Sequence, residues 1–512
     1  MSHFKHVRVI VPLTVFLVVL TILATAGTAL AHASTLKLVT VSSTDPYASC
    51  SIPGNPGINY PDAEVEPWVS VNPANPNNII GVWQQDRWNN GGAQGLVAGF
   101  STNGGKSWGE STLPFSECAP RAINDPFTGA PYDRASDPWV SIGPDGTAYA
   151  VGLLATNNTI SGNNDTGVAA VTSSDGGRTW VNPVLIKSDQ GTSPVFEFTQ
   201  FFNDKESVTA DPNPTHAGTA YVVWDRLVSP SHSPDADLRA HAFEGPSWFS
   251  KTTDGGKTWT GTRPIFDPGQ NSQTIGNQIV VDPRTGVLYD FFQLFQTTGS
   301  PNFTPRGSSV SFISSSDGGN TWSQPTVVST EQTAADTDPN TGAAIRTASG
   351  LPEVAIDAST GQLYAVWEDA RFTGGTVNQA VISTSTDGGA TWSAPAAVST
   401  PSGRPAFTPA VAVNSAGTVA VTYYDFRNLA AGNTTTLPTD YWLTSSTNHG
   451  ASFGNEIHIA GSFDMLNAPF AGGFFVGDYE SLTTIGTTFE PFFVQTNDEN
   501  TSNRTDVFTT FI

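Results

Sequence analysis

One eight-residue pattern recurs six times along this chain, and no other feature limits the possible fold as strongly. The pattern is Ser/Thr-x-Asp/Asn-Gly-Gly-x-Ser/Thr-Trp. It occurs at residues 101–108, 173–180, 252–259, 315–322 and 385–392, and a degenerate copy occurs at 446–453. Its Asp/Asn positions are spaced by 72, 79, 63, 70 and 61 residues. These intervals are too long for a single hairpin and suit a four-stranded sheet with variable loops, so the sequence indicates a repeat protein.

The chemistry of the pattern is structural. Its carboxylate or amide oxygen accepts hydrogen bonds from free backbone N–H groups of a tight turn, and the Gly-Gly pair supplies the positive φ angles that the turn needs. The aromatic ring fills the gap between neighbouring strands. We therefore expect six residues to hold turns, namely Asn103, Asp175, Asp254, Asp317, Asp387 and Asn448.

A second repeat interleaves with the first and consists of two strand-like apolar runs bounded by Gly, Pro and Asp. Its copies begin near Trp68, Trp139, Ser207, Gln278, Glu353, Pro409 and Glu480. There are thus seven pairs of first and second strands but six turn patterns, and the last unit stops after a third strand at 505–512. Residues 36–41 can supply its missing fourth strand. We predict an all-β fold, a β-propeller of seven four-stranded blades closed by an N-terminal strand, with six blades as the alternative.

The N-terminus has the features of an export signal. A basic start precedes a long apolar run that ends in small-x-small patterns near Ala31 and Ala33. We expect a signal peptide at 1–33 and a single propeller domain at 34–512, so that the mature protein is secreted. The apolar run is also long enough to span a bilayer, which leaves an uncleaved cell-surface anchor as the alternative.

The charge of the chain excludes one class of partner. The formal net charge is −23, although charged residues make up only 13% of the sequence. Such a surface repels phosphate backbones, so we do not expect binding to nucleic acid. The eight His residues form no metal-ligand spacing, and the Gly-Gly pairs all lie in turn patterns, so no metal or other cofactor is predicted. Asp336 and Asp338 are better explained as an acidic loop than as calcium ligands.

The turn patterns resemble the Asp-box (BNR) repeats of the sialidase superfamily, and residues 36–512 resemble secreted bacterial sialidase-like propellers. The resemblance implies that the boxes lie away from the ligand, whereas the loops after strands 2 and 4 surround it. Long insertions do fall in those loops, among them 186–204, 225–247 and 293–308. Cys50 and Cys118 follow the fourth strands of adjacent blades, so we expect a disulfide between them; two unpaired thiols are the alternative.

Four arginines recur beside an aspartate at the end of strand 2, namely Arg87, Arg226, Arg371 and Arg427. Sialidases hold the carboxylate of the sugar with three arginines, so the resemblance implies that these residues bind substrate. A pair that recurs in four units is better explained, however, as an Asp–Arg bridge that ties strand ends together.

The last unit opens with Gly477-Asp478-Tyr479-Glu480. In sialidases a tyrosine beside carboxylates is the nucleophile and a glutamate is its base, so the resemblance implies catalytic roles for Asp478, Tyr479 and Glu480. Tyr423-Tyr424-Asp425 is a second candidate, and Asp133 and Asp137 are candidate general acids. Each of these residues also suits a structural role.

The sequence departs from sialidases in one respect: the Phe/Tyr-Arg-Ile-Pro segment that supplies one of their arginines is absent. Two hypotheses therefore stand. The first is a glycoside hydrolase of the exo-alpha-sialidase type that acts on terminal acidic sugars of glycans. The second is a non-catalytic propeller that binds a glycan or protein through its loop face. In either case we expect a monomer.

Overall fold

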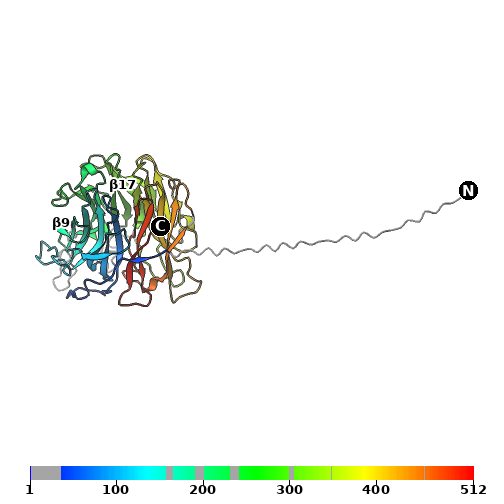
Figure 1. Cartoon of the computed structure of the whole chain (residues 1–512), viewed down its shortest axis with the longest axis horizontal. Coiled ribbons are helices and arrows are strands. Elements are labelled where there is room, and N and C mark those ends of the chain that lie inside the picture. Colours follow the sequence, from blue (N-terminus) through cyan, green and yellow to red (C-terminus); the bar gives the residue numbers. More distant parts are fainter. Residues whose placement is uncertain are drawn as a thin grey trace. The chain divides into compact units, whose positions relative to one another are not determined.

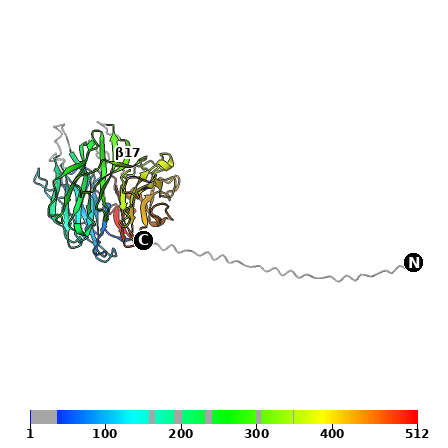
Figure 2. The same ribbon diagram turned by 90° about the horizontal axis from the view of Figure 1, so that it is seen from above.

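The regular secondary structure of the described residues is almost entirely β-strand, and this confirms the all-β class. The computed structural model describes Met1 and residues 36–156, 165–190, 201–230, 241–298, 305–347, 349–454 and 456–512 (Figures 1 and 2). They form strands β1 to β29 and three short 3₁₀ helices, at Pro214–His216, Arg371–Thr373 and Met465–Asn467. Apart from Met1, the predicted signal peptide lies outside the described residues, as do parts of the loops 186–204, 225–247 and 293–308. No helix of the described residues is long and apolar enough to cross a bilayer.

The strands pair in chain order as antiparallel units of four. The first three units are β2–β5 (Val65–Val71, Ile79–Arg87, Ala93–Ser101, Gly109–Thr112), β6–β9 (Arg134–Ile142, Ala148–Ala155, Thr166–Ser173, Val181–Asp189), and β10, β11, β13 and β14 (Phe201–Ala210, Ala220–Pro230, Ser247–Thr252, Arg263–Phe266). The short strand β12 (Ala242–Gly245) joins the third unit to the fourth by pairing with β11 and β15.

The next three units are β15–β18 (Ser272–Val281, Leu288–Thr297, Pro305–Ser315, Thr326–Thr330), β19–β22 (Glu353–Ile356, Leu363–Asp369, Gln379–Ser385, Ala396–Ala397) and β23–β26 (Ala406–Val413, Val419–Asp425, Pro438–Ser446, Ile457–Asp464). The last sheet combines β27 (Ser481–Ile485), β28 (Thr488–Thr496) and β29 (Thr505–Thr509) with β1 (Val39–Thr40). In this sheet Val39 pairs with Thr509 and Thr40 with Phe508, antiparallel.

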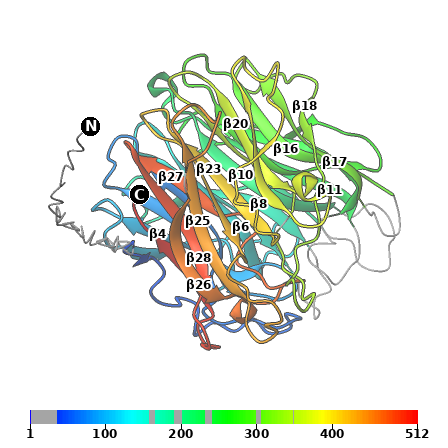
Figure 3. The ribbon, with the colours of Figure 1, turned by 90° about the vertical axis from the view of Figure 1, so that its right-hand side faces the viewer.

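The first strands of the units contact one another in sequence: β2 with β6, β6 with β10, and on through β15, β19, β23 and β27. Strand β27 in turn contacts β2, so N-terminal and C-terminal segments lie together, as the blue and red ribbons in Figure 3 also show. The beginnings of these strands therefore share one end of the sheet assembly. Because each turn pattern joins a third strand to a fourth, those turns lie at the opposite end.

The turn patterns carry a common set of hydrogen bonds. In the turn at Asp175, the carboxylate Oδ1 accepts from the backbone N–H of Thr179 at 3.0 Å, and the Ser173 hydroxyl accepts from the N–H of Gly177 at 3.0 Å. The two glycines have φ angles of 76° and 88°. An N–H four residues on also donates to the equivalent side-chain oxygens, those of Asn103, Asp254, Asp317, Asp387 and Asn448.

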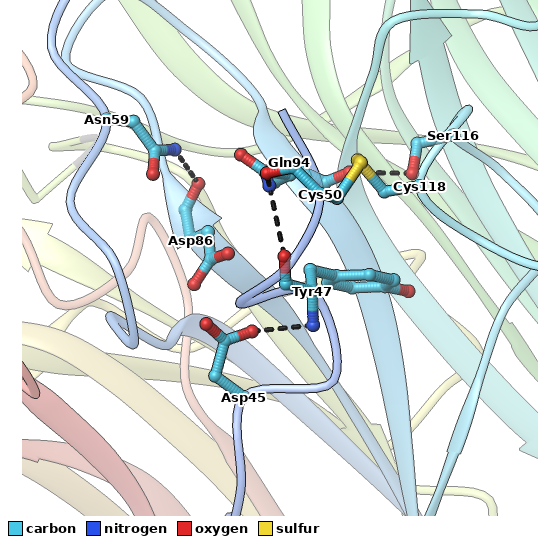
Figure 4. Close-up of a disulfide and its surroundings, with 8 residues drawn as sticks. All are labelled: Asp45, Tyr47, Cys50, Asn59, Asp86, Gln94, Ser116 and Cys118. Atoms are coloured by element: carbon cyan, nitrogen blue, oxygen red, sulfur yellow. Dashed lines mark hydrogen bonds between the residues drawn. A yellow bond between two sulfur atoms is a disulfide. The ribbon is translucent and has the colours of Figure 1, made fainter. Parts of the chain in front are cut away.

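A disulfide ties the N-terminal segment to the first unit (Figure 4). The sulfur atoms of Cys50 and Cys118 are 1.94 Å apart, and the two Cα atoms are 5.7 Å apart. Beside the bridge, the Gln94 amide donates to the backbone carbonyls of Tyr47 and Cys50 at 3.3 and 2.8 Å. The segment between β1 and β2 is therefore held by covalent and hydrogen bonds.

Candidate functional site

Five of the first strands contain a β-bulge near their beginning. A bulge places an extra residue on one strand and redirects its side chain. In each bulge one residue has a positive φ angle: Glu66 (54°), Asp137 (50°), Lys205 (49°), Gly276 (71°) and Thr408 (48°). This conformation is unfavourable for residues other than glycine, so four of the five bulges hold strained backbone. Three of these residues, Glu66, Asp137 and Lys205, have ionisable side chains.

Four of these bulges and the segments before β19 and β27 surround a pocket that is partly open to solvent. We call it the central pocket. Its ionisable lining residues are Lys205, Glu206, Glu353, Glu368, Asp478 and Tyr479, and Trp139 adds an aromatic ring. These residues come from four different units, so only the assembled sheets bring them together.

Lys205 is the hub of an ion network in this pocket. Its Nζ atom lies 2.6 Å from Asp478, 3.1 Å from Asp137 and 3.2 Å from Glu66. Burial by itself would lower the pKa of Lys205, but the carboxylates around it, Asp137 and Asp478 foremost, hold that pKa well above its usual value. The ammonium group is therefore charged at any physiological pH.

Arg346 also binds Asp478. Its guanidinium donates to Asp478 through Nε at 2.9 Å and through a terminal nitrogen at 2.5 Å. Burial raises the pKa of Asp478, but Arg346 and Lys205 outweigh burial and hold the pKa below its usual range. The segment that carries Arg346 is docked by backbone bonds between Arg346 N–H and Phe474 C=O, and between Phe474 N–H and Ala344 C=O, each 3.0 Å.

Tyr479 packs in an aromatic cluster at the pocket wall. Its ring lies 5.3 Å from that of Trp139, which stacks on Trp68 at 3.4 Å. The phenol donates to the backbone carbonyl of Pro138 at 3.2 Å. Burial, and then the negative charge of Glu66, raise the pKa of Tyr479 well above its usual value. The expected tyrosine nucleophile requires the opposite shift, so this environment does not activate it.

Asp137, Asp478 and Tyr479 are thus brought together as expected, but Glu480 is not part of the group. Its Oε2 accepts from the backbone N–H of Val494 at 3.2 Å, and it does not line the central pocket. Asp133, the other candidate acid, is buried outside the pocket lining as well. The second tyrosine candidate, Tyr424, donates to the Val494 carbonyl at 2.6 Å and is fully buried.

None of the four predicted substrate arginines lines the central pocket. Arg226 binds both oxygens of Asp189, at 2.7 and 2.6 Å. Arg371 binds Asp369 in the same way, at 2.9 and 2.7 Å. Arg427 is held by Asp425 and Glu456. These three guanidinium groups are already paired with carboxylates of the chain, which favours the structural Asp–Arg bridge, and their binding of a substrate stays a prediction.

Arg87 differs from the other three arginines. It is buried, donates to the Gln84 side chain at 2.6 Å, and lies over the ring of Phe475, which also contacts Arg346. Burial, and then the nearby charge of Arg346, lower the pKa of Arg87 to about 10. Arg87 is thus not a lining residue of the central pocket.

Three carboxyl groups of the pocket have pKa values that are shifted in the opposite direction to that of Asp478. Burial raises the pKa of Glu206, Glu353 and Glu368 well above the usual value. Both carboxyl oxygens of Glu206 lack a hydrogen-bond partner among the described residues. The pocket therefore combines neutral carboxylic acids with one ionised carboxylate. No group of three or more His, Cys, Asp or Glu in the described residues is arranged to hold a metal ion.

Sequence reasoning missed Glu66, Lys205 and Arg346. The first two could have been found by aligning the beginnings of the first strands, which places Glu66-Pro67-Trp68, Asp137-Pro138-Trp139 and Lys205-Glu206-Ser207 at one level. Arg346 lies in a segment between units that has no counterpart elsewhere in the repeat, so no such signal exists for it.

No family model matches the chain, and no curated protein matches it. Solved structures with a similar arrangement include a Dyadobacter fermentans protein of unknown function (14% identity, 90% of this chain and 99% of that chain, TM-score 0.44). A Hadza microbial sialidase has 14% identity over 85% of this chain and 73% of its own, with a TM-score of 0.43. A Penicillium chrysogenum alpha-L-arabinanase has 14% identity over 93% and 98%, with a TM-score of 0.44. We draw no conclusion about activity from these likenesses.

Proposed function

We propose that this chain is a glycoside hydrolase whose reaction takes place in the central pocket. Hydrolysis of a glycosidic bond commonly uses two carboxyl groups, one that donates a proton and one that is ionised. Asp478 is kept ionised by Lys205 and Arg346, and the neutral acids of the pocket can supply the proton. This pairing of opposite protonation states in one pocket is the observation that carries the proposal.

In this proposal Asp478 stabilises the positive charge that develops at the anomeric carbon. Lys205 and Arg346 fix its carboxylate and keep it charged. Trp139 and Tyr479 offer an apolar wall for the carbon face of a sugar ring. The proposed catalytic groups are therefore carboxyl groups that line the pocket, in place of Tyr479 and Glu480.

We propose a neutral sugar as the substrate. An acidic sugar would need a free cation, whereas Lys205 already contacts three carboxylates and Arg346 binds Asp478 through two nitrogens. The net charge of −23 adds a repulsive field for any anion. Exo-alpha-sialidase activity on terminal acidic sugars is the alternative that the same assay tests.

We also propose that the seven four-stranded units are blades of one propeller built from Asp-box repeats and closed by the N-terminal strand. The pairing of β1 with β29 and the contact of β27 with β2 support this closure. We further propose that the leader directs export and that the mature protein acts outside the cell on a glycan. A disulfide is stable in that oxidising setting, which fits the proposal.

The test is hydrolysis of fluorogenic glycosides by the purified mature protein. The panel holds neutral pyranosides, a neutral α-L-arabinofuranoside and a sialoside, and the variant is Asp478→Asn. The control is Glu490→Gln, because Glu490 is also buried and bonded, to Thr509, but lies outside the pocket lining. We expect turnover of a neutral glycoside that Asp478→Asn abolishes and Glu490→Gln preserves.

Other outcomes separate the alternatives. Turnover of the sialoside alone would overturn the neutral substrate but keep the hydrolase. No turnover of any glycoside by the unmodified protein would overturn the hydrolase and favour the non-catalytic module, to be examined on a glycan array.

A further inference from the structure

Two acidic side chains meet at one wall of the central pocket. Asp336 lies between β18 and β19, and Glu368 lies in β20. The Thr347 hydroxyl is 2.9 Å from Asp336 Oδ2 and 3.2 Å from Glu368 Oε2, and the Asn378 amide nitrogen is 3.0 and 3.2 Å from the same two oxygens. The same hydroxyl and the same amide nitrogen thus contact both carboxyl groups, so the two groups lie close together. They form a pair, which we call the carboxyl dyad.

The dyad must retain a proton near neutral pH. Two carboxylates that share the same two donors cannot both be ionised without a strong like-charge penalty, so one of them keeps its proton. Asp336 and Glu368 are only 4% and 2% exposed, and neither forms an ion pair with a basic residue among the described contacts. Burial, and then the charge of Asp336, raise the pKa of Glu368 well above its usual value.

Only one member of the dyad reaches the central pocket. Glu368 and Thr347 line it, whereas Asp336 lies behind them outside the lining. The other oxygen of Glu368, Oε1, accepts from the backbone N–H of Thr408 at 2.8 Å. Thr408 occupies a bulge of the next unit, so the carboxyl group is oriented from two units at once.

We propose that Glu368 is the proton donor of the central pocket and that Asp336 is the positioning residue that shares its proton. This inference rests on the glycoside hydrolase function proposed above. Glu368 transfers its proton to the glycosidic oxygen while the bond from that oxygen to the anomeric carbon breaks, and the bonding electron pair stays on the oxygen. A water molecule then bonds to the anomeric carbon and returns one proton to the dyad, so both carboxyl groups end as they began.

Glu206 and Glu353 are the competing donors, since both line the same pocket and are also neutral. The two oxygens of Glu206 lack hydrogen-bond partners among the described residues. Nothing therefore orients its proton, whereas Thr347, Asn378 and Thr408 fix the carboxyl group of Glu368. A donor must be held within hydrogen-bond reach of the leaving oxygen, which favours the dyad.

The experiment compares two glycosides of the sugar that the unmodified protein hydrolyses, one with an alkyl leaving group and one with a dinitrophenyl leaving group that needs no proton. We expect Glu368→Gln to lower kcat/KM for the alkyl glycoside by about 10²- to 10⁴-fold, the usual contribution of a general acid, and for the dinitrophenyl glycoside by less than about tenfold. Glu490→Gln should leave both rates unchanged.

Asp336→Asn has a second readout that a merely structural role would not move. Asparagine removes a negative charge beside Glu368 and can donate to its carboxylate, so the pKa of Glu368 falls. The basic limb of the kcat/KM profile should therefore move to lower pH in Asp336→Asn and disappear in Glu368→Gln.

The possible failures are distinct. An equal loss for both leaving groups with an unchanged pH profile would overturn the donor role, as would leaving-group dependence that appears in Glu206→Gln or Glu353→Gln instead. In both cases the protein still hydrolyses glycosides, so the proposed function survives. If the unmodified protein hydrolyses no glycoside, the function and the donor role are both overturned.

Discussion

Protonation of Asp86 should make the folded protein more stable in acid than at neutral pH. Asp86 lies near the end of β3 beside the N-terminal segment (Figure 4), where its Oδ1 accepts from the backbone N–H of Asp62 at 2.7 Å. It is 2% exposed. Burial, and then the charge of Asp45, raise its pKa from 3.8 to about 7.

The direction in which stability changes with pH follows from this raised pKa. Between pH 3.8 and about 7 the folded chain holds a proton on Asp86 that the unfolded chain has lost. The contribution to stability is therefore complete below pH 3.8 and is lost as the pH rises to about 7. Each pH unit in that window corresponds to about 1.4 kcal/mol, or roughly 4 kcal/mol in all. Asp45 and Asp62 share the effect, so we expect about 2–4 kcal/mol from Asp86 itself.

The assay is urea unfolding of the unmodified protein and Asp86→Asn at several pH values from 4.5 to 8, with the disulfide intact. Asparagine keeps the oxygen that accepts from Asp62 but cannot ionise. The free energy of unfolding should fall less steeply with pH in Asp86→Asn than in the unmodified protein. Glu499→Gln, a change in an exposed turn, is the control. Parallel curves for the unmodified protein and Asp86→Asn would refute the reasoning.

Three further changes test other parts of the structure. Lys205→Met should lower the free energy of unfolding by about 3–5 kcal/mol, because it leaves buried carboxylates uncompensated, and an unchanged urea midpoint would contradict the ion network. Reduction of Cys50–Cys118, which are 68 residues apart, should cost about 4 kcal/mol of loop entropy by urea unfolding, and a reductant should not affect the double serine variant. Asp317→Ala should lower the melting temperature more than Asp317→Asn, since Asn103 already accepts the same turn hydrogen bond; equal losses would show that the oxygen is dispensable.

The parts of the structure that repeat locally could be predicted from the sequence. The Ser/Thr, Asp/Asn and Gly-Gly positions determine a turn through contacts within five residues, so the hydrogen bonds of Asp175 and its equivalents follow from the pattern alone. The apolar runs between the turns then require strands, and the all-β class follows. The arginines at the strand ends repeat for the same structural reason, since Arg371 and Arg427 bind aspartates two residues before them.

The candidate site could not be predicted in this way, because it depends on what breaks the repeat. Asp336, Arg346 and Thr347 belong to one insertion between β18 and β19, and their partners Glu368 and Asp478 lie in other units. No local spacing relates these residues. The contacts between first strands bring them to one pocket, so the side-chain contacts of the site depend on how the units pack together.

The bulges connect the strain of the fold with the charge of the site. Positive φ angles at Glu66, Asp137 and Lys205 cost of order 1–3 kcal/mol each, and a regular strand would avoid that cost. Without the bulges, however, the three side chains would not be redirected toward one another, and the ammonium group of Lys205 would be buried without its carboxylates. The ion pairs of Lys205 with Glu66 and with Asp137 therefore depend on the bulges of three different strands and offset part of the cost of their strained backbone.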